Sequence, residues 1–215
     1  MKSFKNFLVE REPLPTMDGK TTMEYLQANC SKYLSENNDL DRNIMYRGMP
    51  FKAEGSVVMT VRKDRKPLDT GMGLHTVMDE WFFEKFGHRA RSQGLFVTGD
   101  TKQVSLYGER FIIFPVGEYE YIWSPMVRDL YKMDWNKEMG KSKQFFDPLK
   151  KDTQLTLDPQ QTMLVRGVLE RFQYQTDNIN DALRTKHEVV MMCDQYVAVP
   201  VHLYENDLRY RLEYM

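Results

Sequence analysis

The sequence has few cysteines and no excess of charge of either sign. Its 215 residues include only two cysteines, Cys30 and Cys193. They lie far apart and lack the spacing of metal ligands, so we expect a reducing compartment, buried thiols and no structural zinc. Lysine and arginine number 30 against 31 for aspartate and glutamate. This balance excludes an overall field that would draw the chain to DNA, RNA or an anionic membrane, although a local basic patch stays open.

Long apolar runs are also missing. No stretch approaches the roughly 20 residues that span a bilayer, and no apolar segment of secretory type follows Met1. We therefore expect a soluble protein that has no membrane partner. A chain of this length can bury one substantial core. Because Pro13 and Pro15 stop any helix, we expect an N-terminal tail over residues 1–15 and a single domain over residues 16–215.

Hydrophobic periodicity predicts an α+β domain with a mainly antiparallel sheet, since short strands in hairpins alternate with a few helices. Residues 68–75, which contain Gly71 and Gly73, are predicted to form a loop, and the polar span 136–157 is expected to carry little core. Helices are predicted at 22–35, at 77–86 between a Thr76 cap and Gly87, at 126–131, at 159–173 and at 177–186. Strands are predicted at 44–49, 56–61, 94–98, 111–116, 119–123, 188–193, 196–201 and 208–214, with a tight turn at Gly117.

An arginine inside the first predicted strand is a candidate anion ligand. Arg47 lies between apolar neighbours, where a charge is costly unless it meets a partner or a ligand. Its guanidinium matches paired phosphate oxygens, and Gly48 lets a ligand approach the backbone. The alternative interpretation is an ion pair between Arg47 and a carboxylate at the edge of the sheet.

The block from Gly94 to Gly108 predicts a strand, a turn, a short helical segment and an aromatic residue. Tyr107 would offer a flat face, on which a cationic pyridinium stacks with roughly 0.5 to 2 kcal/mol. Thr98 places a hydroxyl near the end of the strand. Core packing is the alternative role for Phe96 and Tyr107.

An acidic residue opens the last buried strand. Glu188 precedes five apolar residues, so it is either a solvated strand end or a functional carboxylate. In glycoside chemistry a carboxylate stabilises an oxocarbenium-like transition state, and nicotinamide leaves as a neutral ring without a general acid. The four histidines, His75 and His88 among them, show no ligand spacing, so no metal site is expected. A thiol and base pair of Cys193 with His187 or His202 is disfavoured by burial of the thiol.

Together these segments resemble the motifs of the ADP-ribosyltransferases. Tyr46-Arg47-Gly48 is similar to the arginine motif of the toxin-like branch. The segment from Gly94 to Tyr107 is similar to the nicotinamide-stacking segment of poly-ADP-ribose polymerases, and His187-Glu188-Val189 is similar to the strand that bears the family's glutamate. The resemblance implies a split antiparallel sheet and NAD as substrate. It further implies that Arg47, Gly48, Phe96, Thr98 and Tyr107 contact NAD and that Glu188 is catalytic.

The expected activity is mono-ADP-ribosyl transfer to a host protein or nucleic acid. Lys186 stands two residues before Glu188, where the arginine-specific branch has Glu or Gln, so modification of protein arginine is not predicted. The basic residues of the turn at 62–66 could favour a nucleic acid or another protein side chain as acceptor. Val97-Thr98-Gly99 replaces the usual serine-threonine-serine.

The first ten residues resemble the capsid-targeting peptides of internal head proteins from large tailed bacteriophages. Leu8-Val9-Glu10 fits their apolar-x-Glu processing site. The resemblance implies packaging inside the phage head and action in the host cytoplasm. An ordinary amphipathic tail is the alternative. Two further functions stay open: a catalytically inactive protein on the same fold that binds a nucleotide or blocks a host defence component, and a structural internal head protein.

Overall fold

The computed structural model describes residues 15–37, 39–66, 71–130, 133–138 and 156–213. Seven strands of this described part form one antiparallel sheet in the order β2-β7-β4-β1-β3-β6-β5. The predicted α+β class with a mainly antiparallel sheet is confirmed. The strands are β1 (Tyr46–Met49), β2 (Val57–Thr60), β3 (Leu95–Thr98), β4 (Glu109–Val116), β5 (Glu120–Trp123), β6 (Glu188–Met192) and β7 (Gln195–Pro200).

Short and medium helices surround the sheet. In the first half of the chain they are α1 (Gly19–Asn29), α2 (Ser31–Glu36), α3 (Met72–Phe86), α4 (Ala90–Gln93), α5 (Thr101–Val104) and the 3₁₀ turn η2 (Ser105–Tyr107). In the second half they are α6 (Trp135–Glu138), α7 (Pro159–Arg171), α8 (Ile179–Arg184), α9 (Val201–Leu203), the π-helical turn η4 (Tyr204–Leu208) and α10 (Arg209–Glu213).

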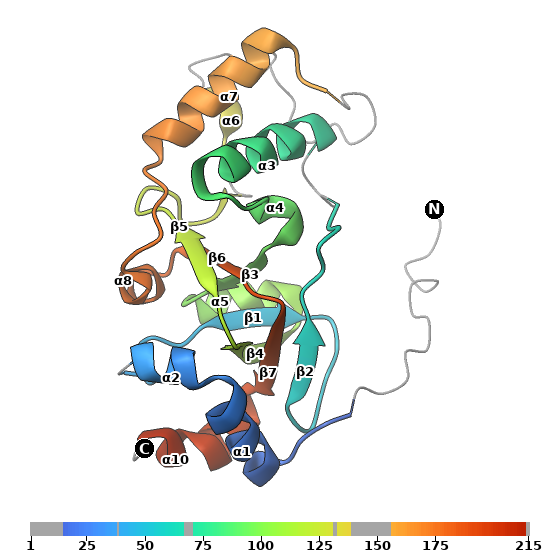
Figure 1. Cartoon of the computed structure of the whole chain (residues 1–215), viewed down its shortest axis with the longest axis vertical. Helices are drawn as coiled ribbons and strands as arrows, with labels where there is room; N and C mark the ends of the chain where they lie inside the picture. The colour runs from blue at the N-terminus through green and yellow to red at the C-terminus, as the bar shows by residue number, and fades with distance from the viewer. Residues whose placement is uncertain (1–14, 38, 67–70, 131–132, 139–155, 214–215) are drawn as a thin grey trace.

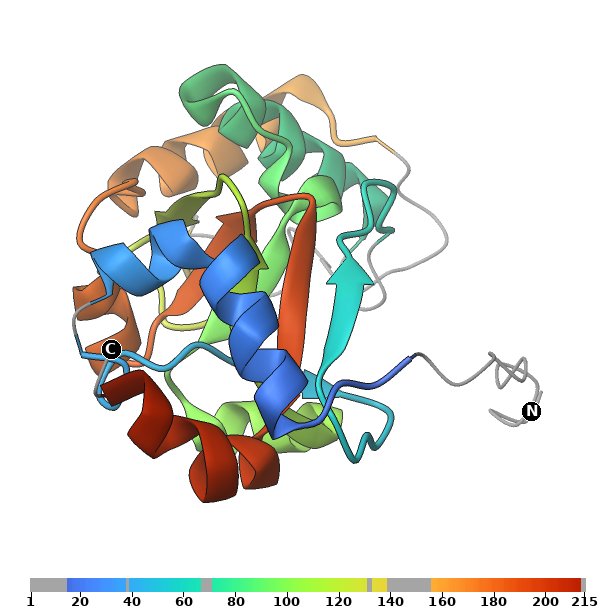
Figure 2. The same ribbon diagram turned by 60° about the horizontal axis from the view of Figure 1, so that its bottom comes forward.

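The helices form two groups that bury two apolar clusters. Figure 1 shows α3 and α7 side by side at one end of the molecule, where they cover β3, β6 and β5 with a cluster that includes Phe82 and Leu169. At the other end, α1, α2 and α10 lie across the sheet (Figure 2) and bury a second cluster that includes Leu26, Phe114 and Leu208. None of the helices in the described ranges has the length and apolar character of a membrane span.

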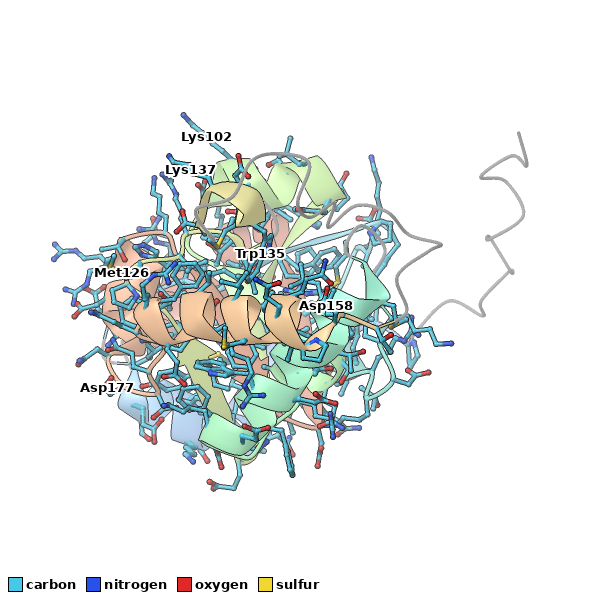
Figure 3. All side chains as sticks on the ribbon, turned by 90° about the horizontal axis from the view of Figure 1, so that it is seen from above. Lys102, Met126, Trp135, Lys137, Asp158 and Asp177 are labelled. Carbon is cyan, nitrogen blue, oxygen red and sulfur yellow. The ribbon has the colours of Figure 1, made fainter. Side chains whose placement is uncertain are left out.

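The helix predicted at 159–173 is confirmed by α7, and its start follows from its sequence. Asp158 accepts from the backbone N–H of Gln161, whose side chain accepts from the backbone N–H of Asp158. Pro159 occupies the first helical position, where no intrahelical N–H is needed. Figure 3 shows Asp158 at one end of α7 and Trp135 beside its middle.

The helix predicted at 77–86 exists but begins earlier. α3 starts at Met72 after Gly71, so Thr76 is an interior residue of the helix and not its cap. Consequently, the loop predicted at 68–75 is wrong from Met72 onward. The predicted end is confirmed, since Gly87 has a φ of 78°, the left-handed conformation that closes helices. The heavy apolar face of Trp81 and Phe82 is buried.

One other predicted helix is confirmed with a break, and two other predicted elements are wrong. The helix predicted at 22–35 divides at Cys30 into α1 and α2. Residues 126–129 of the segment predicted as a helix at 126–131 are not helical, because the Ser124 hydroxyl accepts from the backbone N–H groups of Met126 and Val127 and holds a turn; Leu130 has a 3₁₀ conformation. The strand predicted at 208–214 is helical in its described residues, in which Leu208 is fully buried and Tyr210 is 65% exposed.

The pairing between β1 and β3, at the centre of the sheet, is very short. Within the fully described strands β1 and β3, the register consists of one pair, Tyr46 opposite Thr98. The neighbouring pairings β1–β4 and β3–β6 each contain four register pairs. The strands on either side of Tyr46 and Thr98 therefore form two well-paired halves that meet at this point. The same point brings Arg47, Thr98 and Glu188 onto adjacent strands.

Candidate functional site

Thr98 and Glu188 are direct neighbours across two strands. Thr98 on β3 lies opposite Glu188 on β6, and residues opposite each other in an antiparallel pair share one face of the sheet. Thr98 is buried, and its hydroxyl accepts from the backbone N–H of Asp100. The backbone N–H of Glu188 donates to the carbonyl of Arg128 at 3.0 Å. This hydrogen bond fixes the backbone of Glu188, the residue predicted to be catalytic, at the start of its strand.

Arg47 reaches across the junction between the two halves of the sheet. Its Nη1 donates to the carbonyl of Phe96 on β3 at 2.7 Å. Burial lowers the pKa of the guanidinium, with a small opposing effect from Tyr196. Among the described residues no carboxylate forms an ion pair with Arg47, so the structure does not give it the edge carboxylate of the alternative interpretation.

Two further arginines join Arg47 around one phenyl ring. The guanidinium carbons of Arg65 and Arg91 lie 4.8 Å and 5.0 Å from the centroid of the Phe96 ring. Arg65 also donates to the carbonyl of Gly94. Burial lowers the pKa of Arg65 to about 10, and repulsion from Arg47 and Arg91 adds to this effect. We call Arg47, Arg65 and Arg91 the arginine cluster. Within the described part of the chain none of the three has a carboxylate in ion-pair contact.

Charges of the arginine cluster act on the carboxylate of Glu188. Burial raises the pKa of Glu188 to about 7, the Arg91 charge opposes this shift, and the Asp129 carboxylate adds to it. The Leu130 N–H and Arg65 also lower the pKa of this carboxylate. Arg65 therefore interacts both with Arg47 and with Glu188 and links the two residues that the sequence singled out.

A buried histidine borders the same cluster. His75 Nε2 lies 3.5 Å from Asp79 Oδ2. The other oxygen of this carboxylate, Asp79 Oδ1, accepts from the backbone N–H of Arg91 at 2.7 Å. Burial and then the charges of Arg91 and Arg65 lower the pKa of His75, against the effect of Asp79. Among the described residues, His75 Nδ1 and Arg91 Nε have no hydrogen-bond partner although both atoms are buried. Unpaired buried polar atoms are costly and point to a polar ligand.

Tyr107 lies beside β1 but on the other side of the strand from Arg47. A Cβ at Gly48 would stand 2.8 Å from Tyr107 Cβ and 2.2 Å from the Val104 carbonyl oxygen. Successive strand residues point to opposite faces, so the side chain of Arg47 points away from Tyr107. The Tyr107 ring is 52% exposed. Gly48 is needed for the close approach of α5 and η2, which is a structural reason that differs from the ligand contact we predicted.

The structure thus assembles four of the six predicted site residues, Arg47, Phe96, Thr98 and Glu188, and adds Arg65 and Arg91. From the sequence we predicted Arg65 only as one of the basic residues of a charged turn that could favour an acceptor, and its charged neighbours gave no sign of burial. Arg91 was not considered. Arg65 and Arg91 stand out only by their contact with the Phe96 ring, and the sequence alone does not reveal that contact. Two guanidinium groups lie against the ring of Phe96. The ring therefore packs against the apolar core and also contacts the arginine cluster.

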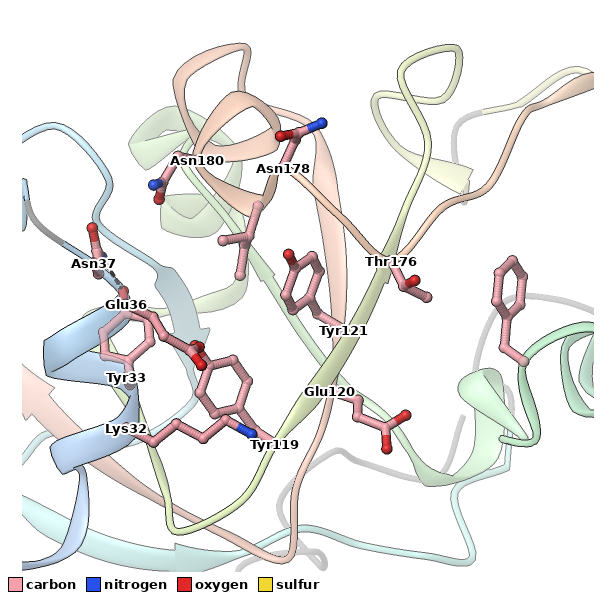
Figure 4. Close-up of a pocket in the computed structure, with 12 residues that line it drawn as sticks. Lys32, Tyr33, Glu36, Asn37, Tyr119, Glu120, Tyr121, Thr176, Asn178 and Asn180 are labelled. Carbon is pink, nitrogen blue, oxygen red and sulfur yellow. Dashed lines mark hydrogen bonds between the residues drawn. The ribbon is translucent and has the colours of Figure 1, made fainter.

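A cavity lies elsewhere in the described part of the chain. It has a volume of about 730 Å³ and lies beside the outer edge of β5 (Figure 4), where residues of α2, of β5 and the turn before it, and of α8 and the segment before it line it together with Phe86 of α3. Its lining does not contain Arg47, Thr98 or Glu188. We assign the candidate catalytic chemistry to the arginine cluster because cavity volume alone does not supply reactive groups.

The described residues contain no group of three or more histidine, cysteine, aspartate or glutamate side chains that could hold a metal ion. Cys30 and Cys193 are both buried free thiols, and burial raises their pKa values. In comparisons with family models, curated proteins and solved structures, nothing matches this chain.

Proposed function

We propose that this protein is a mono-ADP-ribosyltransferase that cleaves the nicotinamide glycosidic bond of NAD and transfers ADP-ribose to a host macromolecule. The observation that carries the proposal is the arginine cluster, three partly buried guanidinium groups that form no ion pair with a carboxylate of the described residues, next to a partly buried glutamate. A dinucleotide brings two negative phosphates and a positive nicotinamide ring. Those charges complement the arginine cluster and Glu188, respectively.

In the proposed reaction the bond between the nicotinamide nitrogen and C1′ of the ribose breaks. Its electron pair leaves with neutral nicotinamide, so no acid has to protonate the leaving group. The ionised Glu188 carboxylate stabilises the positive charge that develops at C1′. An acceptor hydroxyl, amine or carboxylate forms the new bond to C1′, and any proton it loses passes to solvent or to a neighbouring base. Thr98, opposite Glu188, is positioned to orient that carboxylate or the ribose.

Incubation of the purified protein with labelled NAD and host lysate tests the proposal. We expect label to enter a macromolecule, and digestion with protease or nuclease then tells a protein acceptor from a nucleic acid. Glu188→Gln should abolish transfer while the variant remains folded and still binds NAD. Absence of both transfer and nicotinamide release from the wild-type protein, in lysates of several candidate hosts, would overturn it.

The second candidate function is a catalytically inactive binding protein on the same fold. The arginine cluster favours it, because its guanidinium groups have no ion-paired carboxylate in the described part of the chain and can bind an anion without any reaction at Glu188. In that case NAD or a related nucleotide raises the melting temperature, and Glu188→Gln leaves the biological effect unchanged. The capsid-targeting resemblance of residues 1–10, which lie outside the described residues, is tested by mass spectrometry of purified virions for a chain that begins at Arg11.

A further inference from the structure

The segment that follows β3 exposes two large apolar side chains. Leu106 is 73% exposed and Tyr107 is 52% exposed, and both belong to the turn η2 that continues α5. The backbone of this segment packs closely on β1, since a Cβ at Gly48 would stand 2.2 Å from the Val104 carbonyl oxygen. The turn is thus fixed on the sheet while both side chains remain largely exposed. The proposed NAD site does not use Tyr107, so its exposed ring needs another explanation.

Two exposed lysines lie on the segments between η2 and Glu188. Lys102 is in α5, just before η2, and Lys186 stands two residues before Glu188. Figure 3 shows Lys102 extending outward at the margin of the molecule. No carboxylate of the described residues is in ion-pair contact with either lysine. Both ammonium groups can therefore bind an anionic ligand.

The carboxylates of the same segments have partners within the protein. The exposed or partly exposed ones form ion pairs, Asp100 with Arg128 at 2.9 Å, Glu109 with Lys52 at 3.6 Å and Asp181 with Arg184 at 2.7 Å. Asp129 is buried and accepts from Gln103 Nε2 at 2.9 Å. The charge that remains for a ligand on these segments is therefore positive, although the whole chain has no excess of basic residues.

Packing brings these segments together beside Glu188. The Asp100 carboxylate, which pairs with Arg128, also caps α5. The Arg128 carbonyl accepts from the backbone N–H of Glu188. A Cβ at Gly99 would stand 2.0 Å from the Leu183 carbonyl oxygen, so the end of α8 packs on the turn that leads into α5. We call the resulting surface the α5 surface and define it by its exposed residues Lys102, Leu106, Tyr107, Arg128 and Lys186.

The backbone of Lys186 has a conformation that favours glycine. Its φ is 63°, and its N–H donates to the Leu183 carbonyl at 3.1 Å, which closes α8. A Cβ destabilises this left-handed conformation, and glycine is the usual residue at this position after a helix. Backbone outliers of this kind concentrate at functional sites. A ligand contact of the ammonium group would explain why a lysine occupies the position.

We propose that the α5 surface binds a single-stranded nucleic acid, with a base stacked on Tyr107 and backbone phosphates at Lys102 and Lys186. An exposed aromatic ring beside cationic groups matches the bases and phosphates of a strand, and stacking requires a base that is not held in a duplex. Because the α5 surface borders Glu188, the bound strand is the acceptor of ADP-ribose. That role rests on the proposed function, whereas the binding itself needs no NAD.

Fluorescence anisotropy with short labelled oligonucleotides of mixed sequence, as DNA and as RNA and without NAD, tests the binding. We expect Tyr107→Ala to weaken it about tenfold, as for removal of one base-stacking ring. Phe83→Ala is the matched control and should leave the affinity unchanged, because Phe83 is a 51% exposed aromatic residue on α3 that also lies beside a cation, Arg89. Equal losses in the two variants would overturn the proposal.

Salt titrations test the two lysines. Each phosphate contact contributes about 0.7 to the slope of log affinity against log salt concentration for a single strand. Lys102→Gln and Lys186→Gln should each reduce the slope by about this amount, whereas Lys20→Gln, on α1 and paired with Glu24, should not. An unchanged slope in both of the first two variants would contradict the proposed phosphate contacts.

Lys186→Gly separates binding from stability. Glycine is favoured at this φ, so the variant should have a higher melting temperature and yet bind the oligonucleotide more weakly. A loss of affinity in a stabilised protein cannot come from misfolding. Unchanged affinity of this variant would overturn the role of Lys186.

Three further outcomes would overturn nucleic-acid binding: no binding at low salt, equally tight binding of a duplex of the same length, or tighter binding of oligoglutamate, which represents an acidic peptide. With labelled NAD, the wild type should transfer label to the strand, and Tyr107→Ala should transfer less. Nicotinamide release without oligonucleotide binding would overturn this inference and leave the proposed function standing. Binding without release would overturn the proposed function and leave the α5 surface as a nucleic-acid site.

Discussion

The arginine cluster and the β5 edge differ in charge, in shape and in how far they can be read from sequence. The arginine cluster is cationic, is buried against Phe96 and adjoins the glutamate whose pKa is raised to about 7. The β5 edge is hollow, acceptor-rich and anionic. An anionic nucleotide, the proposed ligand, is complementary in charge to the arginine cluster and not to the β5 edge. Charge therefore separates the two regions more clearly than cavity volume does.

The largest expected effect on NAD binding follows from removing the central guanidinium. Arg65→Gln should weaken NAD binding by at least tenfold, since a charge-assisted contact to a phosphate contributes about 1.5 to 3 kcal/mol. Isothermal titration calorimetry measures the change. Arg62→Gln is the matched control, because Arg62 is exposed and pairs with Asp64. An equal loss of affinity in both variants would mean that NAD binding depends only on the net charge of the protein and not on the arginine cluster.

A second prediction concerns stability and pH. The pKa of Glu188 is about 7 in the folded protein against 4.5 for the free side chain. The folded state then binds more protons than the unfolded state between these values, so the free energy of unfolding falls as pH rises through this window. Linkage gives a loss of up to about 3 kcal/mol between pH 4.5 and pH 7.

Urea titrations across this pH range compare the wild type with Glu188→Gln. The variant lacks this titration and should be the more stable protein at pH 8. An identical pH dependence in the two proteins would show that Glu188 is solvated, in contrast to the buried site described above.

A third prediction tests how β1 is held next to the arginine cluster. Gly48→Ala brings a Cβ within 2.2 Å of the Val104 carbonyl oxygen and should lower the free energy of unfolding by about 1 to 3 kcal/mol. Gly167→Ala, on an exposed turn of α7 with no atom within 4 Å, should raise it by up to about 1 kcal/mol. Thermal unfolding of both variants checks the pair. Equal shifts of the same sign would contradict the close packing of η2 on β1.

The smallest effect is expected from the aromatic residue that the family resemblance singled out. Tyr107 lies on the side of β1 away from Arg47, so Tyr107→Ala should change KM for NAD only a few-fold, less than Arg65→Gln. Tyr107→Phe separates stacking from hydrogen bonding by the hydroxyl. If Tyr107→Ala weakened NAD binding more than Arg65→Gln does, the nicotinamide ring would have to bind on the Gly48 side of β1, which contradicts the proposed site.

Much of the fold could be predicted from local sequence. The strands have alternating or continuous apolar residues, and α7 has a capping box, so short-range rules suffice there. The C-terminal segment shows where they fail. Leu208, Tyr210 and Leu212 alternate as in a strand, but Tyr204, Leu208 and Leu212 also recur every four residues, and all three are buried. The segment is helical because Tyr204, Leu208 and Leu212 are buried together on one side of a helix. Their burial depends on tertiary packing, which local sequence rules do not describe.

The candidate site was predictable only in part. Glu188, Thr98 and Arg47 were identified because a polar residue at the end or middle of an apolar strand is unusual. Arg65 and Arg91 come from a charged turn and a short helix, and nothing in their neighbourhoods distinguishes them from solvated residues. They become significant because β3 brings Phe96 between them. The cavity beside the β5 edge was missed for the same reason, since its walls come from four separate segments.

Release of nicotinamide from NAD by the purified protein is the most direct measurement of the central claim, that the arginine cluster and Glu188 form one site for NAD. Chromatographic assays at pH 8 compare the wild type with Glu188→Gln and with Arg62→Gln. The account predicts release by the wild type and by Arg62→Gln, and a loss of about 100-fold or more in Glu188→Gln, as for removal of a transition-state electrostatic contact. Release that is unchanged in Glu188→Gln would contradict it.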